Sequence, residues 1–272
     1  MMIKVDLHTH SKFSDGALTV HELMELAMKN HVQEIAITDH ETIDNIQNYR
    51  ELEKRYAVKI IPGIEIPTNM KGLHILGYGI KKFERMQSFV DDFKVINRQR
   101  TEKTIELLQG DGIDISVEKI EEIAASNVIT KRDIVQYMVL KGYASTTYEV
   151  YKNFIGRGNK AYVPLHKIPY EEVITIIKEC GGISVIAHPH SLPKNTDFQY
   201  IIPHMKRYGL VGIETYTIRH TFEERRFFGS IAKSFDLFET AGTDFHNISE
   251  GNILGIEVED EFLEGFHSCL SD

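Results

Sequence analysis

Short apolar runs alternate with longer amphipathic segments over most of the chain. Apolar runs bounded by turn residues predict buried β-strands, and apolar residues that recur every three or four positions predict helices. The predicted strands cover residues 3–7, 34–38, 59–66, 73–78, 161–164, 183–187, 210–214 and 237–242. The predicted helices between them cover residues 20–29, 42–56, 170–179, 200–208 and 221–233. This alternation is typical of an α/β protein with a mainly parallel sheet.

Residues 81–151 follow a different pattern, in which strand signals disappear and charged helical periodicity takes over. The predicted helices here cover residues 83–108, 117–125, 131–140 and 147–154. We therefore predict one discontinuous domain, residues 1–80 and 161–272, with an inserted helical subdomain at residues 81–160. We expect the insertion to lie over the strand ends as a lid that caps the substrate.

Composition narrows the possible partners and compartments. The formal charge of -9 argues against binding of duplex nucleic acid, although bound divalent metals would still allow a small phosphorylated substrate. The two cysteines, Cys180 and Cys269, are far apart and outside any metal-binding spacing, which favours a reducing cytoplasm. We find no signal peptide and no apolar run of membrane-spanning length, so we expect a cytoplasmic protein without a membrane partner. The oligomeric state stays open.

Polar side chains that could bind metal ions gather at the ends of the predicted strands. His8 and His10 follow the first strand, and their i, i+2 spacing aims both imidazoles to one side of an extended segment. The full set is His8, His10, Asp15, His40, Glu65, His74, His188, Asp244 and His246. Mixed imidazole and carboxylate ligands suit Zn²⁺, Mn²⁺ or Fe²⁺. Since one ion takes about four protein ligands, the set predicts two or three ions that share a bridging carboxylate.

Five motifs in this order resemble those of the PHP (polymerase and histidinol phosphatase) family. They are His8-Thr9-His10 with Ser14-Asp15-Gly16, Thr38-Asp39-His40, Gly63-Ile64-Glu65, Ala187-His188-Pro189 and Gly242-Thr243-Asp244-Phe245-His246. The resemblance covers both halves of the chain. It implies a distorted (βα)7 barrel with a trinuclear metal centre at the C-terminal strand ends.

The same resemblance implies how the nine residues divide among three metal sites. The first site would use His8, His10, Glu65 and Asp244. In the second, Glu65 would bridge to His74 and His188. The third would use Asp15, His40 and His246. Many family members have histidine where this chain has Asp15, which could weaken the third ion or change its metal preference.

The helical insertion and its exit, residues 154–164, resemble the branch of the family that acts on nucleotides. This resemblance implies a metal-dependent phosphatase, with exonuclease activity as a further expectation. Its substrate would be a 3',5'-nucleoside bisphosphate such as pAp, cleaved to a nucleoside 5'-monophosphate, or the end of a short 5'-phosphorylated oligonucleotide. We expect attack by a metal-bridging hydroxide, without a covalent protein nucleophile. Two alternatives are a histidinol-phosphate-type phosphatase on the same centre and a catalytically inactive metal-binding regulatory module.

Six further residues are candidates for contacts to a substrate phosphate. Arg157 is a basic residue between two glycines, and Lys131 and Arg132 begin a predicted helix, where backbone N–H groups favour anions. The other three candidates follow strand ends: His190, Arg219 and His220. For His190 we also consider a role as general acid, and for each residue an exposed or structural role is the alternative. The sequence does not identify the general acid, the physiological metal or the base preference.

Overall fold

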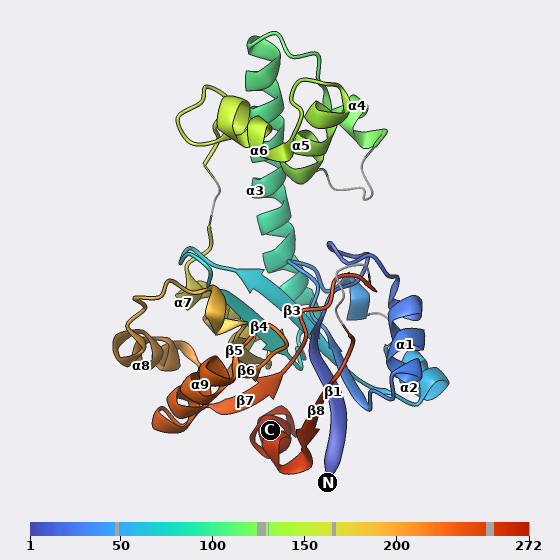
Figure 1. Ribbon diagram of the computed structural model, residues 1–272, viewed down its shortest axis with the longest axis vertical. Coiled ribbons are helices and arrows are strands. Elements are labelled where there is room, and N and C mark those ends of the chain that lie inside the picture. Colours follow the sequence, from blue (N-terminus) through green and yellow to red (C-terminus); the bar gives the residue numbers. More distant parts are fainter. Residues whose placement is uncertain (47–48, 124–128, 130, 165–166, 249–252, 272) are drawn as a thin grey trace. The chain divides into compact units, whose positions relative to one another are not determined.

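The computed structural model describes residues 1–46, 49–123, 129, 131–164, 167–248 and 253–271. The chain divides into two compact units (Figure 1). One comprises Met1–Val90 and Lys167–Asp272, and the other comprises Asp91–His166. The division falls inside one long helix, whereas the sequence places the domain boundary near residue 80. That the helical unit caps the substrate stays a prediction.

The described part of the larger unit contains an eight-stranded sheet with the order β7-β6-β5-β4-β3-β2-β1-β8. Its strands are β1 (Met2–Thr9), β2 (Glu34–Ile37), β3 (Lys59–Pro67), β4 (His74–Tyr78), β5 (Ile183–Ile186), β6 (Leu210–Tyr216), β7 (Phe238–Ala241) and β8 (Ile256–Glu259). Strands β1, β2 and β3 are parallel to one another, and so are β5, β6 and β7. In contrast, β4 runs antiparallel to both of its neighbours, and β8 runs antiparallel to β1.

The sheet curves into a nearly closed barrel. An isolated parallel bridge between Thr9 and Phe245 connects the end of β1 to the segment after β7. The predicted α/β class and distorted barrel are therefore confirmed, with eight described strands where the family resemblance implies seven. The additional strand, β8, lies outside the predicted strands. Its apolar–acidic alternation is only four residues long, so it gives a weak period-two signal.

Two apolar clusters hold the barrel together. One draws Val5, Ile61, Tyr78 and Val185 from four strands together with Phe266 from α10 (Glu264–Ser271), so it fills the barrel interior. The other packs α1 (Val20–Lys29) and α2 (Tyr49–Tyr56) against β2 and β3. Figure 1 shows α1 and α2 on one flank of the barrel, with α7 (Tyr170–Glu179), α8 (Phe198–Tyr208) and α9 (Phe222–Ser234) on another.

Helix starts in this unit follow the local sequence. A capping box starts α1: the Thr19 side chain accepts from the backbone N–H of Glu22, and the Glu22 side chain accepts from that of Thr19. Thr221 and Glu224 form the same motif at the start of α9. The predicted helix over residues 42–56 is shorter in the structure: a 3₁₀ turn, Asp44–Ile46, precedes α2, and residues 47–48 lie outside the described residues.

The smaller unit is helical. Its elements are most of α3 (Phe83–Gly110), α4 (Val117–Glu121), α5 (Lys131–Leu140), α6 (Thr147–Val150) and a π-helical turn, Tyr151–Ile155. The strand predicted over residues 161–164 is wrong. Ala161 is instead buried in the helical core, and Arg100 Nε donates to the Val163 carbonyl at 3.2 Å, so a side chain takes the place of a neighbouring strand.

None of the helices within the described ranges is both long and apolar enough to cross a membrane.

Candidate metal centre

All nine predicted ligand residues lie in the larger unit, at one edge of the barrel. His8 and His10 are at the end of β1, His40 follows β2, and Glu65 lies on β3. His188 follows β5, and Asp244 and His246 follow β7. Because the carboxyl ends of parallel strands meet at the same edge, these side chains converge. His74 is the first residue of β4, and it reaches the same edge because β4 runs in the opposite direction.

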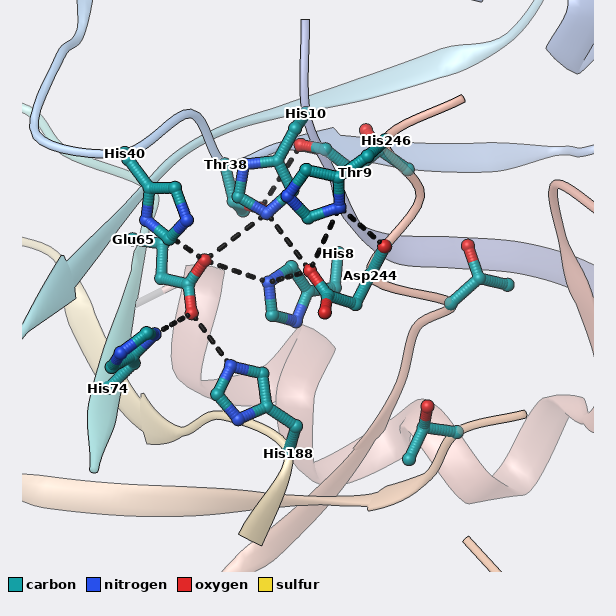
Figure 2. A network of polar contacts seen from close by, with 12 residues as sticks. His8, Thr9, His10, Thr38, His40, Glu65, His74, His188, Asp244 and His246 are labelled. Carbon is teal, nitrogen blue, oxygen red and sulfur yellow. Dashed lines mark hydrogen bonds and ion pairs between the residues drawn. The ribbon is translucent and has the colours of Figure 1, made fainter. Parts of the chain in front are cut away.

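Glu65 lies at the centre of the cluster (Figure 2). Its side chain is only 1% exposed. Its carboxylate oxygens lie 2.8 to 3.3 Å from one ring nitrogen of each of five imidazoles: His8, His10, His40, His74 and His188. A single buried carboxylate with five imidazole neighbours has the surroundings of a ligand shared between ions.

Asp244 and Asp15 extend the cluster to the other side of His10. Asp244 Oδ1 lies 3.2 Å from His10 Nε2, 3.5 Å from His8 Nε2 and 3.6 Å from His246 Nδ1. Asp15 Oδ1 lies 3.3 Å from His246 Nε2 and 3.7 Å from His10 Nδ1. His8 and His10 therefore both face Glu65 and Asp244, as their spacing predicts.

Within the described residues, three groups of donor atoms are compact enough to hold an ion, with all atoms of a group within 4.8 Å of one another. The first is His8, His10, Glu65 and Asp244, the same four residues as in the first predicted site. The second is His40, Glu65 and His74, and His188 Nε2 lies 2.9 Å from the Glu65 oxygen that also faces His74. The third is His10, Asp15, His40 and His246. The assignment of each residue to an ion stays a prediction.

The unsatisfied polar atoms of the cluster fit bound cations. Neither ring nitrogen of His10 makes a hydrogen bond of acceptable geometry, and neither does Nδ1 of His40, although all three atoms are buried. Buried polar atoms are almost always paired, so such orphans call for a partner. Divalent cations would bind these imidazole nitrogens and the facing carboxylate oxygens together, so both kinds of group would gain a partner.

Burial and the charges within the cluster move the pKa values of its side chains strongly. Burial alone would lower the pKa of His10, but Asp244 and Glu65 outweigh it and raise that pKa to about 9. Burial likewise opposes ionisation of Glu65, yet the surrounding imidazoles hold its pKa well below the usual range. For His40 the effect of burial exceeds the opposing effect of Glu65 and lowers the pKa to about 4. The carboxylates are thus ionised at neutral pH and attract cations.

Glu214, on β6, was not among the predicted site residues although it orients two of them. Its Oε1 lies 3.2 Å from His8 Nδ1, and its Oε2 accepts a 2.6 Å hydrogen bond from the backbone N–H of His188. The contact leaves His8 Nε2 facing Glu65 and Asp244. A carboxylate partner of this kind fixes the tautomer of a metal-binding histidine. Glu214 ends a predicted strand, so the signal used for the nine residues could have found it.

Two further buried aspartates hold the loops that carry the ligands. Asp6 accepts from both the backbone and the hydroxyl of Thr243, at 2.9 and 2.7 Å, and burial raises its pKa to about 6. Asp39 accepts from the backbone and hydroxyl of Ser11, both at 2.7 Å, and from Ser14 Oγ at 2.6 Å. The positions of Asp244 and Asp15 thus depend on these two buried carboxylates.

The backbone near the ligands is also unusual. His188 and Asp244 have positive φ angles of 26° and 54°, a region that non-glycine residues seldom adopt. Gly242 approaches β1 so closely that an added Cβ would lie 2.4 Å from the His8 Cβ. Strain that collects around a cluster of titratable side chains is a common feature of functional sites.

The six predicted phosphate-binding residues fall into both units. In the larger unit, Arg219 Nη1 lies 3.2 Å from Asp244 Oδ2, and the His190 ring lies 6.0 Å from that of His188 and 5.0 Å from that of His220. These three residues therefore adjoin the cluster.

The remaining three candidates belong to the helical unit. Lys131 Nζ donates to the Ile155 carbonyl at 3.2 Å and lies 5.3 Å from the centre of the Tyr151 ring, while Arg132 and Arg157 are exposed. Thr130, which precedes them, lies outside the described residues. Contacts between these three side chains and a substrate stay predictions.

Comparisons with known proteins identify curated relatives over nearly the whole chain. The 5'-3' exoribonuclease of Haemophilus influenzae is 31% identical over 252 residues, covering 90% of this chain and 91% of the relative. The phosphoribosyl 1,2-cyclic phosphate 1,2-diphosphodiesterase of Eggerthella lenta is 27% identical, covering 89% and 93%. The 3',5'-nucleoside bisphosphate phosphatase of Chromobacterium violaceum is 26% identical, covering 92% and 90%.

Solved structures and a family model agree with these relatives. A putative metal-dependent phosphoesterase from Bifidobacterium adolescentis has a TM-score of 0.77 and 26% identity, covering 97% of this chain and 95% of that one. The family model for the PHP domain matches residues 6–180. The chain therefore belongs to the PHP domain family of metal-dependent phosphoesterases.

Proposed function

We propose that the protein hydrolyses a phosphate ester of a small nucleotide at a centre of two or three divalent ions held by the nine-residue cluster. The observation that carries this proposal is Glu65, a buried carboxylate within 3.3 Å of five imidazole nitrogens. Mn²⁺, Zn²⁺ and Fe²⁺ all suit such mixed ligands.

The chain's own residues have separate tasks in this proposal. His8, His10 and Asp244 would share one ion with Glu65, and His74 and His188 would share a second. Asp15, His40 and His246 would hold a third. Bound ions would supply an activated water and positive charge for the phosphate oxygens, so no covalent protein nucleophile is needed. Glu214 keeps the His8 ring in one orientation, and Asp6 keeps the loop of Asp244 in place.

We infer that the substrate is a 3',5'-nucleoside bisphosphate, cleaved to a nucleoside 5'-monophosphate, or the end of a short 5'-phosphorylated oligonucleotide. Support comes from the two relatives that are named as a bisphosphate phosphatase and a 5'-3' exoribonuclease. A cyclic phosphate diester is the second candidate, because a relative of similar identity and coverage is named as a diphosphodiesterase.

A substrate panel separates these possibilities. Protein purified without chelators and supplied with Mn²⁺ would be assayed against pAp, a 5'-phosphorylated oligoribonucleotide, a phosphoribosyl cyclic phosphate and histidinol phosphate. We expect the highest kcat/KM on pAp or the oligoribonucleotide. Highest activity on histidinol phosphate would contradict the nucleotide substrate. Bound metal without turnover of any ester would instead indicate a binding module.

Substitution of the central carboxylate tests the centre itself. Glu65→Gln removes a negative charge within 3.3 Å of five imidazoles, and we expect a loss of activity greater than the roughly 10–100-fold typical of residues that only support metal ligands. Glu257→Gln, an exposed glutamate on β8, is the matched control and should keep full activity. Near-normal turnover in Glu65→Gln would refute the assignment of Glu65 as a bridging ligand.

A further inference from the structure

Arg219 lies on the outer side of Asp244, and we propose that it binds an oxygen of the substrate's phosphate at the edge of the metal centre. The ligand class is a phosphate or phosphate-ester oxyanion. That this anion is the substrate rests on the proposed function, whereas anion binding by Arg219 can be tested without turnover.

The two oxygens of Asp244 face different partners. Oδ1 lies toward the imidazoles of His8 and His10, at 3.5 and 3.2 Å, whereas Oδ2 lies 3.2 Å from Arg219 Nη1. The carboxylate thus joins the guanidinium to the residues proposed to hold ions. An anion bound by those ions would lie within reach of the same guanidinium.

Arg219 has donors to spare. A guanidinium carries five N–H donors in a rigid fork, and the described residues give this one a single side-chain partner, Asp244. The Arg219 side chain is 44% exposed although the carboxylate that it contacts is only 9% exposed. Nη1 of the fork therefore faces Asp244 while the side chain as a whole stays partly open to solvent. Arginine is well suited to bind carboxylate and phosphate oxygens in this way.

The segment that carries Arg219 is fixed from two sides. His220 Nδ1 donates to the Thr215 carbonyl at 2.8 Å on one side. On the other, Arg225 Nη2 donates to the Thr217 carbonyl at 3.1 Å. The Arg225 guanidinium also stacks 4.0 Å from the centre of the Tyr216 ring. A phosphate-binding arginine gains from such support, because less conformational entropy is lost when the anion binds.

The imidazole of His220 adds a second observation beside Arg219. His220 is 5% exposed, and its Nε2 is buried without a hydrogen-bond partner. Its ring lies 5.0 Å from that of His190, whose Nδ1 is also buried and unpartnered. Buried polar atoms without hydrogen-bond partners are rare in folded proteins. A ligand beside Arg219 would supply a partner for these imidazole nitrogens. Burial lowers the pKa of His220, so Arg219 provides the fixed positive charge here.

Binding of inorganic phosphate tests the proposal directly. Calorimetric titration of the Mn²⁺-loaded protein would compare wild type with Arg219→Ala, Arg219→Lys and Arg226→Ala. We expect the phosphate Kd of Arg219→Ala to rise by roughly 10-fold or more, since a charge-assisted hydrogen bond is lost. Arg219→Lys keeps the positive charge without the guanidinium fork, so its phosphate Kd should lie between those of wild type and Arg219→Ala. Arg226, exposed on α9, is the matched control and should bind as wild type does.

Metal content, melting temperature and steady-state kinetics of the same variants complete the test. We expect Arg219→Ala to keep its metal and its melting temperature, and to raise KM more than it lowers kcat. The proposal is overturned if wild type does not bind phosphate or if Arg219→Ala binds it equally well. It is also overturned if Arg219→Ala loses affinity only in proportion to lost metal, since Arg219 would then merely support Asp244. Phosphate binding without hydrolysis of any ester would contradict the proposed function while leaving Arg219 as an anion-binding residue.

Discussion

At the scale of single residues, the centre depends on carboxylates that each serve more than one partner. Glu65 faces five imidazoles, and Asp244 faces imidazoles with one oxygen and Arg219 with the other. Glu214 contacts His8 Nδ1 and the backbone N–H of His188. These shared contacts fix ring orientations before any ion binds, which reduces the entropic cost of forming the centre.

Glu214 provides a prediction at this scale. Both carboxylate oxygens of Glu214 face N–H groups, one on His8 Nδ1 and one on the His188 backbone. A glutamine has only one oxygen, so in Glu214→Gln one of these two N–H groups would face an NH₂ donor and lose its acceptor. We expect metal affinity to fall by roughly 10–100-fold, as for other partners of metal-binding histidines. Titration of chelator-treated protein with Mn²⁺ measures this change, with Glu257→Gln as control. An unchanged Kd would show that Glu214 does not orient His8.

The raised pKa of His10 predicts that metal binding depends on pH. In the metal-free protein this pKa is about 9 against an ordinary 6.5, so between these values the folded chain holds a proton that the unfolded chain has lost. The stability that His10 contributes is therefore complete below pH 6.5 and lost as pH rises through 9. A bound ion needs the neutral imidazole, so binding should release this proton and metal affinity should rise over the same window.

Calorimetry of Mn²⁺ binding at pH 7.5 tests this expectation. In two buffers with different ionisation enthalpies, the apparent binding enthalpy should differ in the direction of net proton release. Equal enthalpies in both buffers would mean that no proton is released.

At the level of helices and strands, the centre forms where strand ends meet and where buried aspartates hydrogen-bond to the loops that carry the ligands. Parallel strands bring their last residues to one edge, and β4 brings His74 there from the opposite direction. Gly242 lets the segment after β7 pass directly over His8. Asp6 then anchors Thr243 in that segment.

Gly242→Ala tests this close approach. An added Cβ would lie 2.4 Å from the His8 Cβ and 2.8 Å from Glu214 Oε1, so the segment has to shift. We expect a loss of roughly 1–3 kcal/mol in the free energy of unfolding, as for other overpacked sites, together with reduced metal content. Gly110→Ala is the control, because its Cβ would meet nothing within 4 Å. Equal denaturation curves for the two variants would contradict the crowding.

The sequence predicts the clustering of nine residues because one rule covers most of them: polar side chains follow buried strands. The rule does not reveal the direction of β4, so the convergence of His74 depends on tertiary structure. It also does not separate Glu214, which supports His8, from residues that face the cluster. The wrong strand at residues 161–164 has a similar origin, because its apolar pattern serves the helical core. Short-range patterns cannot distinguish these partners.

At the scale of the whole molecule, all nine residues belong to the barrel unit, and the helical unit contributes none of them. The nearly closed barrel, the match of the PHP family model and relatives that cover about nine tenths of the chain agree on the class of enzyme. We expect the choice of substrate to depend on finer features, such as Arg219 beside Asp244 and the basic residues of the helical unit.

The proposed function requires the nine-residue cluster to be a multinuclear metal centre. Anomalous diffraction from crystals grown with Mn²⁺ tests it most directly, because it locates each ion independently of activity. We predict at least two anomalous peaks within the cluster, with the Glu65 carboxylate between two of them. A cluster without peaks, or a single peak that does not contact Glu65, would show that Glu65 does not bridge a multinuclear centre.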